Sequence, residues 1–240
     1  MDEKVLSDKV TAWRRALHRI PEVGFELPQT TAYIEAELRR MGLEVTRVCG
    51  GSGLTAVIEG EGRGRTVALR ADMDALPIRE ETGLPFASDN GGMHACGHDG
   101  HLAALLGAAE LLRTDRRFPG RVKLLFQPAE ENLGGAKSMV EAHVLDGVDA
   151  VFGMHIGHLS DAAPGVFSFR TGTCMAGFNT FDITVTGRGS HGARPEDGVD
   201  PIVAAAQVVS ALQTLASREH CATDPFVLTV GSIHGGVTYN

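Results

Sequence analysis

The sequence predicts an α/β fold, in which helices cover the faces of a sheet. Short apolar runs alternate along the chain with stretches whose apolar residues recur at helical spacing. Several of the apolar runs lead directly into aspartate, glutamate or histidine residues. Because sites in such sheets collect beyond the carboxyl ends of the strands, the same pattern indicates a functional site at one edge of the sheet.

Two amphipathic helices are expected at the start of the chain. Gly42 follows the second run of periodic apolar residues, and glycine commonly follows the end of a helix. The apolar residues that recur at helical spacing are Val10, Trp13, Leu17 and Ile20 in the first helix, and Ile34, Leu38 and Met41 in the second.

The central part of the chain is expected to alternate strands with helices. The predicted strands are 66–73, 121–127 and 149–155, and the predicted helices are 102–112 and 134–145. Pro128 ends the second of these strands. The polar residues at or just past the strand ends are Asp72, Asp74, Glu130, Glu131 and His155.

Beyond Arg170 the character of the sequence changes. An alternating apolar and polar run within 181–195 becomes a Gly-rich turn that contains His191. A helix is expected over 200–215, with Pro201 in its first turn, and a strand over 225–233. This β-α-β unit predicts a second domain, so we divide the chain into a first domain over 1–175 and a second over 176–240.

The composition favours a small molecule as the partner. The net charge is −8, aromatic residues make up 5% of the chain, and no Lys/Arg run of five or more occurs, so neither nucleic acid nor an anionic membrane is expected as a partner. The N-terminal residues contain no continuous apolar segment, so no signal peptide or membrane span is expected and the expected location is cytoplasmic. The cysteines are widely scattered, which favours reduced thiols.

The stretch H-A-C-G-H-D-G-H, at 94–101, indicates a metal site. Cys96 and His98 are two residues apart, so both side chains project to one side of an extended loop, and Gly97 allows the backbone to approach an ion. Thiolate and imidazole both suit zinc or another borderline transition metal. The alternatives are a closed structural zinc site, a cysteine nucleophile paired with a histidine, and packed or hydrogen-bonded side chains that bind no metal.

The acidic pair Glu130 and Glu131 fits the same site. Adjacent residues that leave a strand point in different directions, so one carboxylate is placed to bind a metal and the other to act on water as a general base. Taken alone, P-A-E-E would be interpreted as a solvated turn. Together with the cysteine and histidine cluster, and with His155 at another strand end, a catalytic metal site is the better interpretation.

Several motifs follow one another from Arg14 to the last residue. They are R-R-A-L-H-R-I-P-E (14–22), L-R-A-D-M-D-A-L-P-I (69–78), M-H-A-C-G-H-D-G-H (93–101), Q-P-A-E-E (127–131), G-M-H (153–155), G-S-H-G-A-R-P (189–195) and the final G-G-V-T-Y-N. With these motifs the chain resembles the M20 metallopeptidase superfamily. It is most similar to the amidohydrolase branch, which includes hippurate hydrolases, N-acyl-amino-acid amidohydrolases and plant auxin-conjugate hydrolases.

This resemblance implies a mixed-sheet metallohydrolase domain flanked by helices, with a smaller inserted α/β domain, ferredoxin-like, that serves as lid and dimerisation domain. It also implies two divalent metal ions per complete subunit. Cys96 would bridge the ions, His98 and His155 would complete the ligands of one ion, and Glu131 would bind the other. Zinc suits these ligands well, and manganese, cobalt and nickel are the alternatives.

The resemblance assigns roles to further residues. Glu130 would be the general base, and Asp74 would orient a ligand histidine. His191, in the lid domain, would help to hold the tetrahedral oxyanion, often across a dimer. Asn240 would lie near the substrate.

The implied reaction is hydrolysis of the amide bond of N-acyl amino acids, hippurate-like or N-acetylated, which releases a carboxylic acid and a free amino acid. The implied assembly is a homodimer formed through the lid. A dipeptidase or aminopeptidase of the same superfamily and an inactive metal-binding or dimerisation fragment are the alternatives. The resemblance also implies that the chain ends inside the lid domain, before the histidine that is the last ligand of the ion bound by Glu131.

Overall fold

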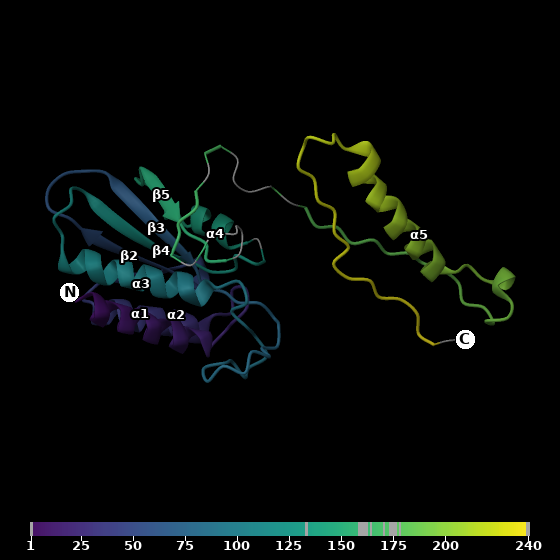
Figure 1. Ribbon diagram of the computed structural model, residues 1–240, viewed down its shortest axis with the longest axis horizontal. Coiled ribbons are helices and arrows are strands. Elements are labelled where there is room, and N and C mark those ends of the chain that lie inside the picture. Colours follow the sequence, from purple (N-terminus) through teal and green to yellow (C-terminus); the bar gives the residue numbers. More distant parts are fainter. Residues whose placement is uncertain are drawn as a thin grey trace. The chain divides into compact units, whose positions relative to one another are not determined.

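The computed structural model describes residues 2–132, 134–157, 163, 165–169, 171–172, 177 and 179–238. The chain divides into two compact units, Met1–Ser168 and Phe169–Asn240. The first unit contains the sheet and the helices that cover it (Figure 1). The division of the chain into a catalytic and a lid domain at residue 175 stays a prediction.

Two helices open the first unit, as the apolar periodicity predicts. Helix α1 spans Glu3–His18 and buries Trp13 and Leu17, and the Asp2 side chain caps it by accepting from the backbone N–H groups of its first turn. Helix α2 spans Pro28–Arg40 and begins with a proline, which needs no N–H partner at that position. Gly42, at φ 77°, takes the left-handed conformation that follows the helix end.

Five strands form one mixed sheet in the order β1-β2-β4-β3-β5. Strands β1 and β2 pair antiparallel, as do β2 and β4, whereas β3 runs parallel to both β4 and β5. The mixed α/β architecture confirms the predicted fold class. The strands are β1 (Val45–Val48), β2 (Gly53–Glu59), β3 (Thr66–Asp72), β4 (Arg121–Gln127) and β5 (Ala150–Gly153).

Strands β1 and β2 were not expected from the sequence. They are separated only by a short 3-10 turn, Cys49–Gly51, and they add an antiparallel edge to the sheet. The segment L-T-A-V-I-E within β2 is apolar and β-branched, so its composition was the available signal. The three predicted strands all form, and the last of them, β5, ends two residues before His155.

Two further helices follow the sheet strands. Helix α3, His98–Thr114, contains the predicted apolar segment and starts at the second histidine of the motif. Helix α4, Gly135–Glu141, is shorter than the predicted 134–145, because His143 adopts a left-handed conformation (φ 57°) that ends the helical path.

The core lies on both faces of the sheet. Leu124 and Phe126 of β4 belong to the main cluster, which α1, α2 and α3 cover, and Figure 1 shows these helices together along one side of the sheet. Leu125, between them, belongs to a second and smaller cluster with Met139 of α4. The alternation follows from the two-residue period of a strand, because neighbouring side chains point to opposite faces.

The topology determines where polar side chains meet. Strands β3, β4 and β5 run parallel, so their carboxyl ends lie at the same edge of the sheet. The chain leaving β3 contains Asp74, the chain leaving β4 contains Glu130 and Glu131, and the chain leaving β5 contains His155. Helix α3 begins with His98.

In the second unit, helix α5 (Pro201–Thr214) forms as predicted, capped by Asp200, and continues as a π-helical turn, Leu215–Glu219. The predicted strands within 181–195 and over 225–233 do not form in the described part of this unit. A strand requires a partner for its backbone groups, and the backbone pairing described here is a single bridge between Arg188 and Val199. A ferredoxin-like arrangement is therefore not evident.

Among the described residues, no helix is both long and apolar enough to cross a membrane.

Candidate metal centre

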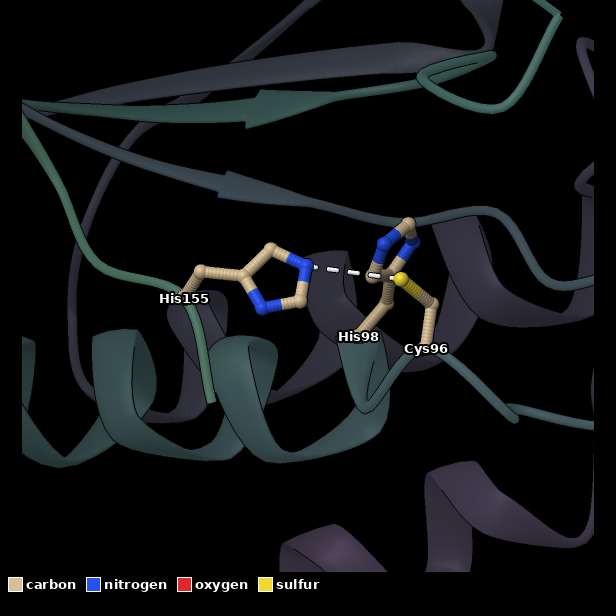
Figure 2. A group of neighbouring side chains, drawn as sticks. All are labelled: Cys96, His98 and His155. Carbon is tan, nitrogen blue, oxygen red and sulfur yellow. Dashed lines mark hydrogen bonds between the residues drawn. The ribbon is translucent and has the colours of Figure 1, made fainter. Parts of the chain in front are cut away.

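Cys96, His98 and His155 lie together although they come from two distant segments. Figure 2 shows the His155 ring pointing toward the Cys96 thiol, and the distance from His155 Nε2 to Cys96 Sγ is 3.3 Å. Donor atoms of these three side chains all lie within 4.8 Å of one another. Cys96 lies in the loop before α3, and His98 is the first residue of α3. His155 follows β5.

The two glutamates also lie near His98. His98 Nε2 is 3.7 Å from Glu131 Oε1 and 4.0 Å from Glu130 Oε2. These three residues form a second set of donor atoms within 4.8 Å of one another. His98 is thus common to both sets, and it is almost completely buried.

Asp74 connects the glutamates to His98. Its carboxylate oxygens accept from the backbone N–H groups of Glu130 and Glu131, at 2.9 and 3.1 Å, and its backbone carbonyl lies 2.7 Å from His98 Nδ1. Because a carbonyl oxygen only accepts, Nδ1 must donate, and the other ring nitrogen, Nε2, faces the glutamates. Asp74 is fully buried, so these contacts are shielded from water.

The turn that presents the glutamates is strained. Ala129, which precedes Glu130, has φ 49°, a conformation that costs a residue with a Cβ atom about 1 kcal/mol. Its backbone is held on both sides, because Ala129 N–H donates to Gly24 O and Ala129 O accepts from Gly135 N–H. The hydrogen bonds that the backbone of Glu130 and Glu131 donates to Asp74 add to this constraint.

The chemistry of these donors fits a divalent cation. His98 Nε2 and Glu131 Oε1 are buried and have no hydrogen-bond partner among the described residues, which is costly unless another group satisfies them. The pKa of the Cys96 thiol is raised to about 12. Burial is the largest cause, and a hydrogen bond with Glu131 and the negative charges of the nearby carboxylates act in the same direction. A cation would offset this concentration of negative charge, and it would have to displace the thiol proton.

The sequence profile of Peptidase family M20/M25/M40 matches residues 68–236. The chain belongs to this family. The matched range includes Asp74, the Cys96 loop, the glutamate pair and His155, so the residues that meet at the sheet edge are all within it.

The chain is also similar to individual proteins. The chain is 46% identical over 237 residues to the N-acetyl-L-cysteine deacetylase of Bacillus subtilis, a match covering 98% of this chain and 56% of that protein. It is 42% identical over 247 residues to thermostable carboxypeptidase 1 of Saccharolobus solfataricus, covering all of this chain and 62% of that protein. The chain therefore spans little more than half the length of these relatives.

A solved structure supports the fold. The Bacillus subtilis YXEP protein, described as a dinuclear metal binding peptidase from the M20 family, is 45% identical and superimposes with a TM-score of 0.62. The superposition covers 64% of this chain and 44% of the YXEP chain.

Two residues at this M20 site were not assigned from the sequence. Asp72 Oδ1 lies 2.6 Å from His101 Nδ1, and both side chains are buried. Burial alone would raise the pKa of Asp72, but the His101 hydrogen bond and the charges of Arg70 and His98 lower it to about 2. The spacing of His98 and His101, three residues apart, was the available signal, because such residues share one face of a helix.

Two predicted residues are not placed beside the metal centre by the structure. His191 is exposed and belongs to the second unit, where its Nδ1 accepts from the backbone N–H of Ala193 at 3.1 Å. Asn240 lies outside the described residues. Their predicted contacts with the oxyanion and the substrate stay predictions.

Proposed function

We propose that this chain belongs to a metal-dependent amidohydrolase that cleaves the amide bond of N-acyl amino acids and releases a carboxylic acid and a free amino acid. The observation on which the proposal depends is the meeting of Cys96, His98 and His155 with Glu130 and Glu131 around buried, unpartnered donor atoms. The similarity to an N-acetyl-L-cysteine deacetylase supports this class of substrate. Hippurate-like and N-acetylated amino acids are the substrates to test.

The ligands would hold two divalent ions, divided as the family resemblance implies. Cys96 would be shared by both ions, with His98 and His155 on one and Glu131 on the other. Zinc suits thiolate, imidazole and carboxylate ligands together, and manganese, cobalt and nickel are alternatives whose use depends on their availability. When bound, such ions would polarise the scissile carbonyl and make water at the site easier to deprotonate.

Glu130 would be the general base. Its side chain is 36% exposed, against 21% for Glu131, so it is the more open of the two carboxylates to water and substrate. It would take a proton from the attacking water as the water oxygen bonds to the carbonyl carbon. When the carbon–nitrogen bond breaks, Glu130 would return that proton to the leaving amine.

Asp74 would act without touching the substrate. Its three hydrogen bonds hold the backbone of both glutamates and the Nδ1 side of the His98 ring, so it would maintain the distance between base and ligands.

The second unit would supply the remaining functions. In the complete protein, residues 176–240 would be part of a ferredoxin-like lid that also forms a homodimer. His191 would help to hold the oxyanion, and Asn240 would contact the substrate. Residues 1–175 would form the catalytic domain.

The experiment combines metal analysis with hydrolysis assays. Metal content per chain is measured on the purified protein, and hydrolysis of hippurate and N-acetyl amino acids is followed with and without a chelator. Glu130→Gln should abolish hydrolysis and retain the metal, because the amide cannot take a proton. The control is Glu141→Gln, which changes an exposed glutamate of α4. Normal hydrolysis by Glu130→Gln would disprove its role as base.

A second candidate function is a carboxypeptidase, which the 42% identity to thermostable carboxypeptidase 1 favours. Longer peptides distinguish the two, because a carboxypeptidase should release their C-terminal residue, whereas an amidohydrolase should cleave only the acyl group from an N-acyl amino acid. Release of C-terminal residues from longer peptides would replace the amidohydrolase assignment. Metal binding without cleavage of either substrate would indicate an inactive metal-binding chain.

A further inference from the structure

We propose that His101 is a positioning residue, which holds the segment after β5 against helix α3 so that His155 faces Cys96. This inference rests on the proposed function, because it concerns a ligand of the proposed metal centre. The geometry that supports it is a hydrogen bond from the backbone N–H of Ile156 to His101 Nε2, at 2.8 Å.

The hydrogen bonds determine the state of the His101 ring. A backbone N–H can only donate, so Nε2 of His101 must be unprotonated. The other nitrogen, Nδ1, then bears the proton and donates to Asp72 Oδ1 at 2.6 Å. Both nitrogens of this neutral ring are therefore hydrogen-bonded, and His101 is 3% exposed.

Ile156 joins the two histidines through its backbone. Its N–H donates to His101, and its carbonyl lies 2.8 Å from Nδ1 of His155. Because the carbonyl accepts the proton of His155 Nδ1, this hydrogen bond orients the ring so that Nε2 faces Cys96 Sγ. A hydrogen bond that fixes the position of Ile156 thus also fixes the direction of the His155 ring.

The segment that contains His155 is partly exposed, although the Ile156 side chain also lies against Gly100 of α3. Strand β5 is only four residues long and lies at the edge of the sheet. The neighbouring side chains Met154 and Ile156 are 44% and 48% exposed. The His101 and His155 rings meet edge to face, with centroids 4.7 Å apart.

Asp72 anchors His101 to the sheet. Its second oxygen accepts from Arg70 Nη1 at 2.7 Å, and Arg70 Nε donates to Gln127 at the end of β4. The chain of contacts therefore runs from two central strands, through the His101 ring on α3, to the segment after β5. This arrangement is a carboxylate–histidine pair that supports a ligand segment through its backbone.

The same contacts exclude His101 as a ligand in this conformation. A donor atom of His101 lies within 4.8 Å of donor atoms of Asp72 and His98, which is a grouping that resembles a metal site. Both His101 nitrogens are occupied, however, and binding an ion at Nε2 would require the Ile156 hydrogen bond to break.

The test measures Zn²⁺ affinity by calorimetric titration of the full chain after treatment with a chelator. His101→Leu removes the acceptor for Ile156 and should weaken Zn²⁺ binding about 10- to 100-fold. His101→Gln, whose amide oxygen reaches the position of Nε2, should remain closer to the parent. His143→Asn, at an exposed histidine whose left-handed backbone suits asparagine, is the control and should bind Zn²⁺ like the parent.

A double-mutant cycle separates positioning from a general structural role. If His101 acts through His155, His101→Leu should cause no further loss of Zn²⁺ affinity in a His155→Ala background. Thermal unfolding of each metal-free variant shows whether it is folded. Equal losses from His101→Leu in both backgrounds, or full affinity in His101→Leu alone, would overturn the inference.

The outcomes also separate this inference from the proposed function. If His155→Ala itself binds Zn²⁺ as tightly as the parent, the ligand set of the proposed function is wrong, and the positioning role is wrong with it. If His155→Ala weakens binding and His101→Leu does not, only the positioning role is wrong.

Discussion

His18 Nδ1 lies 2.8 Å from Asp99 Oδ2, which joins the first helix of the chain to the residue directly after His98. The other ring nitrogen of His18 lies 3.1 Å from Glu80, and Arg14 Nε donates to the same Asp99 oxygen. His18, Asp99 and Glu80 are all buried, or nearly so, at their side chains. The first turn of α3, which contains the proposed ligand His98, is therefore joined to α1 by a buried polar cluster.

Replacing His18 should destabilise the fold. In His18→Ala two buried carboxylates lose a hydrogen-bonded partner, while Arg14 still contacts Asp99, so we expect a loss of about 2–4 kcal/mol in the free energy of unfolding. Urea unfolding of the metal-free protein measures it. His143→Asn, at an exposed ion pair with Asp146, should change stability by less than about 0.5 kcal/mol. A similar stability for both variants would contradict the importance of the cluster.

Replacing Asp74 should weaken metal binding through Glu131. In Asp74→Asn one oxygen still accepts a backbone N–H, but the amide group faces the other N–H and repels it. The turn should then lose its fixed geometry, and metal affinity should fall about 10- to 100-fold. Titration with Zn²⁺ checks this. Asp115→Asn, at an exposed pair with Arg117, is the control; equal affinity of Asp74→Asn and this control would refute the role of Asp74.

The sequence predicted those parts of the fold that depend on local pattern. Helices α1 and α2 followed from apolar periodicity, and β3, β4 and β5 from apolar runs that end at polar residues. Strand β2 was missed because its place in the sheet depends on pairing with β4, more than sixty residues away in the chain. The expected strand over 225–233 has suitable composition, but the described residues give it no paired neighbour.

The candidate site shows the same division. Cys96, His98 and the glutamate pair were identified because their residue types and strand-end positions indicate metal chemistry. The supporting contacts were not identified from the sequence. His101 and Asp72 gain their roles because His101 accepts a hydrogen bond from Ile156, which is fifty-five residues away from His101 in the chain. Likewise, Glu22 in the motif at 14–22 accepts from the backbone N–H groups of Gln29 and Thr30 and so caps α2, which local pattern does not reveal.

Acid should destabilise the protein in part through Glu110. The pKa of Glu110 is lowered to about 2 from its usual 4.5, chiefly by a hydrogen bond from Arg113. Burial acts in the opposite direction, and Lys9 lowers the pKa further. Because the folded-state pKa is lower than the unfolded one, the stabilisation is complete above about pH 4.5 and is lost as the pH falls toward 2. The loss should be on the order of 1–3 kcal/mol.

The comparison of Glu110→Gln with the parent isolates this contribution. The variant cannot titrate at this position, so its free energy of unfolding should fall less steeply than that of the parent between pH 4.5 and 2. Glu141→Gln, which removes an exposed pairing with Lys137, should leave the parent's slope unchanged. Parallel pH profiles for Glu110→Gln and the parent would show that Glu110 contributes nothing in this range.

Gly135 should not tolerate a side chain, because helix α4 begins against the turn that presents the glutamates. A Cβ atom at Gly135 would overlap the carbonyl oxygen of Pro128, so Gly135→Ala must push α4 away from the turn. We expect a loss of about 1–3 kcal/mol in the free energy of unfolding. Zn²⁺ binding should also weaken, because Glu130 and Glu131 lie two and three residues after Pro128 in the displaced turn.

The neighbouring Gly134 provides the matched control for this prediction. Its added Cβ would approach only the ring edge of Phe25, at 3.1 Å, and Phe25 is 39% exposed, so its side chain has solvent beside it rather than packed backbone. Gly134→Ala should therefore lose less stability and keep the parent's Zn²⁺ affinity. Urea unfolding and Zn²⁺ titration of the two variants decide the matter: if Gly135→Ala loses stability but binds Zn²⁺ normally, the packing of α4 stabilises the fold without setting the geometry of the glutamates.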